Sequence, residues 1–218
     1  MTVVLYRLLS FILPIRVLRS VGRYGPLEIR WENGRKVVNS DRANQSRGSL
    51  HGVWQRCFRD ARIRELDPAH VLVLGFGAGS VVDILRNELG LSCTITGVDG
   101  DPMMLRIAEE HFNMVASKDL LLVGKDAFEF VEGDLLQYEL VIVDLFVELD
   151  IAKGVETPAF IMELKGLVRP GGVLCINTVV HDAQSAERSA RSGRELRLRF
   201  DQVDEQRYEG QNRVFIAR

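Results

Sequence analysis

Acidic residues stand at the ends of several short apolar runs of this chain. A glycine-rich turn lies between the first apolar run and the acid that ends the second. Gly75, Gly77 and Gly79 follow the run Val71 to Leu74, and Asp99 and Gly100 end the next run, Cys93 to Val98. Glycine lets the backbone turn tightly and lets a ligand approach with no Cβ in the way. We predict a nucleoside site here, with Asp99 accepting hydrogen bonds from the ribose hydroxyls.

Two further acids stand at the ends of later apolar runs. Asp126, followed by Ala127, comes just after Leu120 to Val123 and has capping-box spacing to Glu129, which already explains it structurally. A role for Asp126 in binding therefore depends on its place at a strand end. Asp144 ends Leu140 to Val143 and has no obvious helix to cap, so we predict that it lies in the site. The loop from Val147 to Val155 carries Glu148 and is a candidate wall for an acceptor.

Segments with helical spacing of apolar residues separate these runs, and the helices they predict would position the acids. Between the glycine turn and Asp99, apolar residues recur at helical spacing from Val81 to Leu89, and Gly90 stands where a C-terminal glycine belongs. Asp101 and Pro102 suit the N-cap and first position of the next helix. Alternating strands and helices predict an α/β, Rossmann-like, doubly wound fold with a mostly parallel sheet.

The flanking regions add smaller elements. Residues 26–38 are predicted to form a β-hairpin around the Asn33-Gly34 turn, and residues 50–63 a helix whose Trp54 packs in the core or lines a pocket. After the strand Val173 to Asn177, an arginine-rich helix is predicted over 185–200, as a solvated face, followed by two terminal strands. We therefore expect an N-terminal part, residues 1–64, and a Rossmann-like domain, residues 65–218.

The composition is that of an ordinary globular protein. The 218 residues carry a formal net charge of −2, which predicts no nucleic-acid partner. The three cysteines are scattered and favour a cytoplasmic setting without a metal site. Residues 3–18 are apolar but interrupted by Arg7, Pro14 and Arg16, so we expect neither a membrane span nor a secretory signal. Packing on the core or on a second subunit is the preferred interpretation of this segment; a membrane-surface anchor is the alternative.

From residue 26 onward the chain resembles the spermidine synthase family, within the class I methyltransferase fold. The resemblance implies a seven-stranded sheet with a C-terminal antiparallel hairpin, and a homo-oligomer such as a dimer. It rests on several segments in order: LEIRWENGRKVVNSDRANQ, VLVLGFGAGSVVDIL, GVDGDPMMLRIAEEHF, LLLVGKDAFEFV, YELVIVDLF and LVRPGGVLCIN.

The resemblance also implies roles for individual residues. Asp99 matches the family's ribose-binding acid, Asp126 the acid that reads the adenine amino group, and Asp144 the aspartate that activates the acceptor amine as a base. Gln45 lies where the family has a glutamine before its first helix, which implies substrate binding. The implied cofactor is S-adenosylmethionine or its decarboxylated form.

Two family positions lack their expected acid. The family has an aspartate in the glycine loop, where this chain has Ala78, and another three residues after the catalytic one, where this chain has Val147. Those acids hold cationic amines, and their loss removes Coulomb attraction. An aspartate in the glycine loop would also repel the carboxylate of S-adenosylmethionine, whereas alanine would not. Glu148 or Asp150 are candidates to replace the missing acids.

Three functions follow from these observations. The first is methyl transfer from S-adenosylmethionine to a small polar acceptor, with Asp144 orienting the acceptor or taking its proton. The second is aminopropyl transfer in polyamine synthesis, with acids supplied by the loop after Asp144. The third is a non-catalytic nucleoside-binding protein. We expect a small-molecule acceptor in both enzymatic cases.

Overall fold

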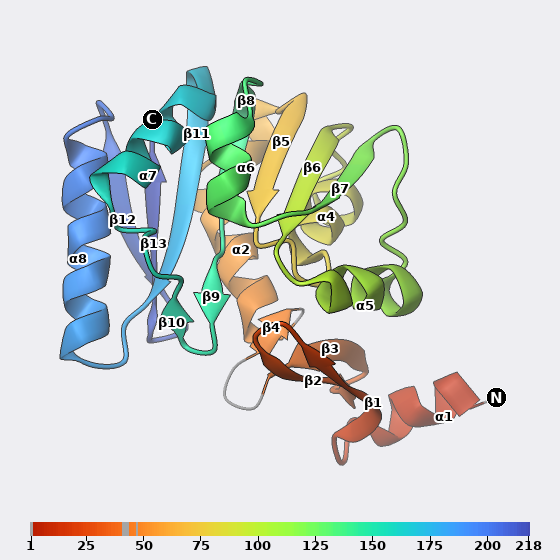
Figure 1. The fold of residues 1–218 in the computed structure, drawn as a ribbon. Helices are drawn as coiled ribbons and strands as arrows, with labels where there is room; N and C mark the ends of the chain where they lie inside the picture. Colours follow the sequence, from red (N-terminus) through yellow and green to blue (C-terminus); the bar gives the residue numbers. More distant parts are fainter. Residues whose placement is uncertain (1, 41–43, 47) are drawn as a thin grey trace.

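A seven-stranded sheet forms the centre of the molecule, as Figure 1 shows. The computed structural model describes residues 2–40, 44–46 and 48–218. Strand order is β12-β13-β11-β8-β5-β6-β7, with β13 antiparallel to both neighbours and the other pairs parallel. This confirms the predicted fold. The strands are β5 (His70–Leu74), β6 (Thr94–Asp99), β7 (Leu120–Gly124), β8 (Tyr138–Val143), β11 (Val168–Val179), β12 (Val203–Tyr208) and β13 (Asn212–Ala217).

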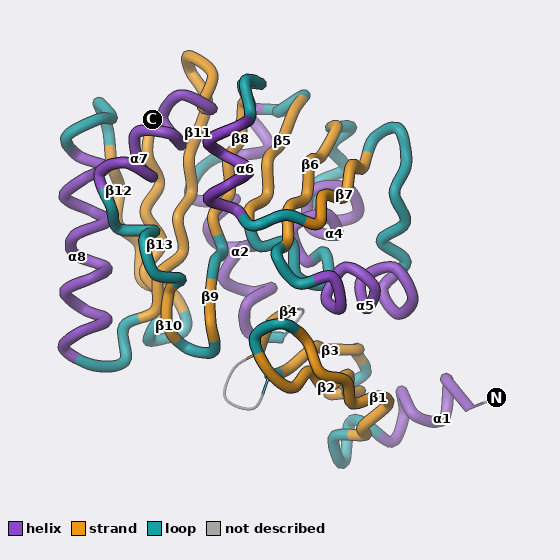
Figure 2. The backbone as a smooth tube through the Cα atoms, viewed as in Figure 1, coloured by secondary structure: helices purple, strands orange, loops and turns teal. Residues whose placement is uncertain are grey.

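Helices cover both faces of this sheet (Figures 1 and 2). Alternate residues of β5 point to opposite faces, so that Val71 and Val73 join one core and Leu72 and Leu74 the other. One face packs against α2 (Ser49–Asp60), α3 (Ile63–Leu66), α4 (Ser80–Asp83) with its π-helical continuation η1 (Ile84–Glu88), and α5 (Pro102–Phe112). The other packs against α6 (Ala127–Gly133), α7 (Pro158–Leu167) and α8 (Ala183–Arg197).

A second, four-stranded antiparallel sheet lies below the carboxyl ends of the parallel strands (Figure 1). The predicted hairpin is its centre, and Asn33 and Gly34 both have the positive φ that such a tight turn requires. The structure adds a strand on each side, so the hairpin was only part of the element. Its order is β1 (Ile15–Gly22), β2 (Gly25–Glu32), β3 (Arg35–Asn39) and β4 (Asn44–Ser46).

The apolar segment at the start of the chain divides into helix α1 (Thr2–Leu9), a turn and strand β1. The large apolar side chains described between residues 4 and 13 are exposed, and Phe11, Ile12 and Leu13 are 62%, 79% and 69% exposed. The expectation that this segment packs on the core is therefore wrong for these residues, because β1 extends the small sheet instead. Contact with a second subunit stays a prediction. Among the described residues, no helix is long and apolar enough to cross a membrane.

Some element boundaries differ from expectation for local reasons. The helix predicted over 50–63 ends at Asp60, since Arg62 adopts a left-handed conformation with φ of 53° before the short α3. The loop after Asp144 contains a two-stranded ribbon of β9 (Phe146–Val147) and β10 (Asp150–Ile151). Asp101 caps α5 and Pro102 begins it, as predicted.

Candidate active site

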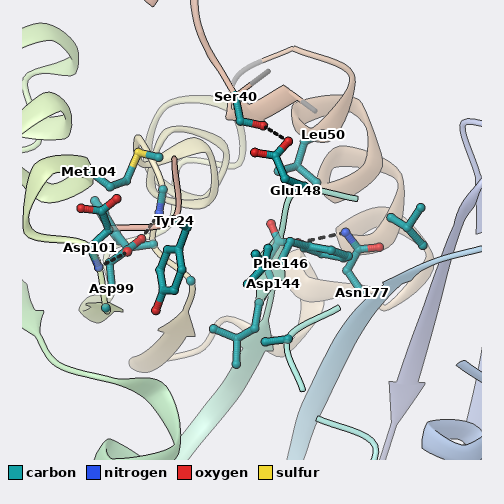
Figure 3. Close-up of a pocket in the computed structure, with 18 of the residues that line it drawn as sticks. Tyr24, Ser40, Leu50, Asp99, Asp101, Met104, Asp144, Phe146, Glu148 and Asn177 are labelled. Carbon is teal, nitrogen blue, oxygen red and sulfur yellow. Dashed lines mark hydrogen bonds between the residues drawn. The ribbon is translucent and has the colours of Figure 1, made fainter. Parts of the chain in front are cut away.

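A pocket of about 540 Å³ opens between the two sheets, at the carboxyl ends of the parallel strands (Figure 3). This is the edge at which doubly wound sheets bind ligands. Its floor contains the glycine loop and the ends of β6 and β8, and its sides contain the start of α2 and the β9–β10 ribbon. The turn between β1 and β2 reaches it from the small sheet.

The glycine loop turns sharply beneath the pocket. Gly75, Gly77 and Gly79 all have positive φ, of 85°, 57° and 80°. A Cβ on Gly75 would lie 2.2 Å from the carbonyl oxygen of Asp144, so only glycine allows the loop to pass the end of β8 this closely. Gly75 and Gly77 line the pocket, whereas Gly79 caps α4 and faces the side chain of Met114.

Asp99 ties the end of β6 to the glycine loop. Its Oδ2 accepts a hydrogen bond from the Gly77 amide at 2.9 Å, and its Oδ1 accepts one from the Asp101 amide at 2.9 Å. Burial raises the pKa of Asp99 to about 6, although these hydrogen bonds act in the opposite direction. Each oxygen keeps a lone pair for a further donor, and the side chain lines the pocket beside Gly100.

Asp126 and Ala127 line the same end of the pocket, where β7 leads into α6. Oδ1 of Asp126 accepts a hydrogen bond from the Phe128 amide at 3.0 Å, so Asp126 caps α6 through the Phe128 amide and not through the capping box with Glu129 that its spacing suggested. Asp126 can therefore cap α6 and bind a ligand at the same time, because its second carboxylate oxygen remains available.

Asp144, at the end of β8, is fixed by two side chains. Trp54 Nε1 donates to its Oδ2 at 2.9 Å, and Asn177 Nδ2 donates to its Oδ1 at 2.9 Å. Asn212 Nδ2 in turn donates to Oδ1 of Asn177 at 3.1 Å, which sets the orientation of that amide. Burial raises the pKa of Asp144 to about 6, against the effect of the two donors. Asp144 is therefore held in one orientation and is mostly ionised at pH 7.

Neither donor to Asp144 was assigned this role from the sequence. Asn177 ends the apolar run of β11, so the strand-end rule that selected Asp99 and Asp144 also applies to it. Trp54 carried no such signal, because its partner lies 90 residues away in the sequence. Core packing and a pocket wall were both considered for Trp54, and both describe it, since it is fully buried and also borders the cavity.

Glu148 stands at the turn of the β9–β10 ribbon with φ of 56°. Its Oε2 accepts a hydrogen bond from Ser40 Oγ at 2.9 Å, and both residues line the pocket. Gln45 belongs to β4, and its side chain lies outside the part of the chain that is described. Ala78 is fully buried in the core, so its methyl group does not form the pocket surface.

The charged side chains that line the pocket are acidic in the part of the chain that is described. Among the described residues that line it there is no lysine, arginine or histidine. Carboxylates occur at both ends, so the cavity favours cationic ligands. The acidic lining residues are Asp99, Asp101, Asp126, Asp144, Glu148 and Glu209.

A separate group of potential metal ligands lies outside this pocket. One potential ligand atom from each of His51, Asp83 and Glu88 lies within 4.8 Å of the others. His51 Nε2 is 2.6 Å from Glu88 Oε1, and Gln55 donates to the other Glu88 oxygen at 2.7 Å. These bonds join α2 to η1, and we assign the group this structural role.

Comparison with known proteins identifies two kinds of relative. Residues 72–176 match the model of a methyltransferase domain. The chain is 30% identical over 122 residues to an eEF1A lysine and N-terminal methyltransferase homolog of Drosophila pseudoobscura pseudoobscura, covering 51% of this chain and 18% of that protein. It is 31% identical over 126 residues to a polyamine aminopropyltransferase of Vibrio vulnificus, covering 55% of this chain and 42% of that protein. The chain thus spans less than half the length of these relatives.

Solved structures show the same two kinds of likeness. A probable spermidine synthase from Corynebacterium glutamicum superposes with a TM-score of 0.75 and 15% identity, covering 92% of this chain and 79% of that chain. Human methyltransferase-like protein 13 in complex with SAH superposes with a TM-score of 0.60 and 22% identity, covering 78% and 79%. At these identities the superpositions establish the fold.

Proposed function

We propose that this chain, a spermidine synthase-like member of the class I S-adenosylmethionine-dependent methyltransferase fold, transfers an alkyl group from an S-adenosyl nucleoside to a small amine. The relatives include both methyltransferases and aminopropyltransferases. Methyl transfer from S-adenosylmethionine is the first form of the proposal, and aminopropyl transfer from its decarboxylated form is the second.

The acidic lining of the pocket carries the proposal. The sulfonium of either donor is a cation, and so is an amine that arrives protonated. Carboxylates at both ends, without a lysine, arginine or histidine among the described lining residues, attract two such cations and bring them together. An anionic substrate would be repelled by the same surface.

The nucleoside would occupy the end of the pocket formed by β6 and β7. Asp99 would accept hydrogen bonds from the two ribose hydroxyls, and Asp126 would accept one from the adenine amino group. Gly75 and Gly77 expose backbone there without side chains in the way. This arrangement uses the free lone pairs of both carboxylates and leaves their existing hydrogen bonds intact.

The acceptor amine would lie between Asp144 and Glu148. Asp144 first takes one proton from the ammonium group, which frees the nitrogen lone pair. This lone pair forms a bond to the carbon next to the sulfonium, the carbon–sulfur bond breaks with its electrons going to sulfur, and the positive charge passes from sulfur to the alkylated nitrogen. Trp54 and Asn177 hold Asp144 in place, and much of the rate would come from alignment of the two substrates.

One feature beside the pocket supports methyl transfer, although Ala78 lies in the core and does not face the donor. Helix α2 begins beside the pocket, at Ser49, and a helix N-terminus stabilises an anion such as the carboxylate of S-adenosylmethionine. The acidic lining favours the decarboxylated donor instead, because that molecule has lost its carboxylate. This is the specific observation behind the second form of the proposal.

The wider setting is part of the proposal. All three cysteines are buried and free, which supports a reducing, cytoplasmic environment. Exposed apolar side chains on α1 and the following turn support a homodimer through this segment. No nucleic-acid partner is proposed, because the chain has a net negative charge.

A product assay tests the proposal. The protein is incubated with each donor and a panel of small amines, and products are identified by mass spectrometry. Methyl transfer gives a methylated amine and S-adenosylhomocysteine, whereas aminopropyl transfer gives a lengthened amine and 5′-methylthioadenosine. Nucleoside binding without either product would favour the non-catalytic alternative and contradict the proposed reaction.

A further inference from the structure

The turn between β1 and β2 is anchored to the nucleoside end of the pocket. The Arg23 amide donates to Oδ2 of Asp101 at 2.8 Å, and Arg23 Nη1 donates to the carbonyl oxygen of Gly100 at 3.1 Å. The other Asp101 oxygen accepts the Met103 amide at 2.9 Å, and the residue is buried. The carboxylate that holds the turn is thus itself immobilised at the start of α5.

This contact requires a very close approach of the two segments. A Cβ on Gly22 would lie 2.1 Å from Oδ2 of Asp101 and 2.9 Å from Cδ1 of Leu27. Real Cβ atoms do not tolerate the first of these distances, and the Asp101 carboxylate is not free to move away. Any side chain at position 22 would therefore displace the turn.

The anchored turn places Tyr24 beside the acids of the nucleoside end. Figure 3 shows its ring next to Asp99 and Asp101, at the edge of the cavity. A Cβ on Gly100 would lie 2.9 Å from the Tyr24 hydroxyl oxygen. Burial raises the pKa of this hydroxyl; Arg23 opposes the shift, whereas Asp126, Asp99 and Asp101 add to it, as expected for a group lying among three carboxylates.

The Tyr24 ring is only partly buried by packing within the protein. The side chain is 44% exposed although the turn that carries it is fixed. The Arg23 guanidinium lies 5.6 Å from the ring centroid, a distance compatible with a cation–π contact. A fixed, half-exposed aromatic ring at a cavity edge is suited to stack on a flat ligand group.

The four-stranded sheet that carries Tyr24 also borders the other end of the pocket. Ser40, after β3, donates to Glu148, and a Cβ on Gly25 would lie 3.7 Å from Glu148 Oε1. The four-stranded sheet therefore contacts both ends and forms the roof of the cavity. Tyr24 is the aromatic side chain that this roof presents over Gly100.

We propose that Tyr24 forms the outer wall of the nucleoside site, its ring stacking on the adenosine group held between Asp99 and Asp126. The inference rests on the proposed function and adds a residue from the small sheet to it. Adenosine bound there is enclosed by the glycine loop on one side and the Tyr24 ring on the other.

Calorimetric titration with 5′-methylthioadenosine tests the stacking, because this probe has the adenosine group without a charged tail. Tyr24→Ala is expected to weaken binding about 10-fold or more, whereas Tyr24→Phe keeps the ring and stays within about 3-fold of the unaltered protein. Tyr6→Ala, which changes a tyrosine on α1 outside the pocket, is the matched control. Unchanged affinity in Tyr24→Ala, or an equal loss in Tyr24→Phe, overturns the proposal.

Displacing the turn while keeping Tyr24 provides the second test. Gly22→Ala is expected to weaken binding of the same probe to a similar extent, and Gly166→Ala, whose Cβ enters open space on α7, is expected to have no effect. The probe should also slow amide exchange at residues 22–25 of the unaltered protein. Unchanged exchange at these residues overturns the proposed contact between the turn and the bound nucleoside. If the unaltered protein does not bind the probe, the proposed function fails as well, whereas normal binding by Tyr24→Ala overturns this inference alone.

Discussion

The indole nitrogen of Trp54 lies 2.9 Å from Oδ2 of Asp144 and donates a hydrogen bond to it. Trp54 belongs to α2 and Asp144 to the end of β8, so the bond fixes a helix against the carboxylate that we propose as the base. With Asn177 on the other oxygen, the Asp144 side chain has little freedom to rotate. The same donors keep the buried carboxylate ionised near neutral pH.

Replacing Trp54 by Phe should shift the pH dependence of turnover. The ring volume is largely kept, but Asp144 loses one donor to its ionised form, so its pKa should rise above the value of about 6. The acidic limb of the profile should therefore move to higher pH. Trp31→Phe, on β2, is the control, and an identical shift in that variant would contradict the assignment.

Asp144→Asn should separate binding from catalysis. Asparagine has the same shape but accepts no proton, so turnover should fall about 100-fold or more. Affinity for 5′-methylthioadenosine should change by less than about 3-fold, since Asp144 lies away from the proposed nucleoside end. Asp201→Asn, at an exposed position between α8 and β12, is the matched control. Turnover equal to that of the control would remove Asp144 as the base.

Asp99→Asn should weaken nucleoside binding. The variant loses the negative charge and one acceptor oxygen, and poorly satisfied ribose hydroxyls should cost about 1–3 kcal/mol. Calorimetry with 5′-methylthioadenosine measures this loss. An affinity equal to that of the unaltered protein would exclude Asp99 from the site.

The pH dependence of nucleoside binding follows from the same residue. Because the pKa of Asp99 is raised to about 6, the carboxylate gains a proton and loses an acceptor as the pH falls through that value. Affinity for 5′-methylthioadenosine should be constant from about pH 7 to 8 and decline below about pH 6. Asp99→Asn should remove most of this decline, and an unaltered pH profile in the variant would contradict the assignment.

Arg188 should position the loop that carries Glu148. From α8, its Nε and Nη2 donate to Glu156 at 2.8 and 3.0 Å, and it also donates to the carbonyl oxygens of Ile151 and Ala152. Lysine cannot form this fork, so Arg188→Lys should lower the unfolding free energy by about 1–3 kcal/mol, measured by chemical denaturation. Arg191→Lys, on the same helix and exposed, should be close to neutral. Equal effects of the two changes would exclude this anchoring role.

Local chemistry made much of the fold predictable. Asn33-Gly34 specifies a tight turn, Asp101 and Pro102 begin a helix, and the apolar runs before Asp99 and Asp144 form buried strands. These features depend on neighbours in sequence, and the resulting strand order brings the acids to one edge of the sheet. The seven-stranded arrangement itself was implied by resemblance.

Contacts between distant segments were not predictable in the same way. Residues 15–22 form strand β1 because they pair with β2. Their apolar pattern alone indicated a segment that packs on the core or on a second subunit. Arg188 was expected on a solvated face, yet it reaches a buried acid and two carbonyl groups. Trp54 and Tyr24 gain their positions from partners 70 or more residues away, through Asp144 and the Arg23–Asp101 contact. No spacing rule encodes such pairs.

Calorimetric titration of the unaltered protein with S-adenosylmethionine and with its decarboxylated form tests the central claim most directly. We expect saturable binding of an S-adenosyl nucleoside. S-adenosylmethionine should bind more tightly if the chain transfers methyl groups, and the decarboxylated donor should bind more tightly if it transfers aminopropyl groups. Competition by 5′-methylthioadenosine should displace either one, since all three share the nucleoside end. Failure of both donors to bind would contradict the account.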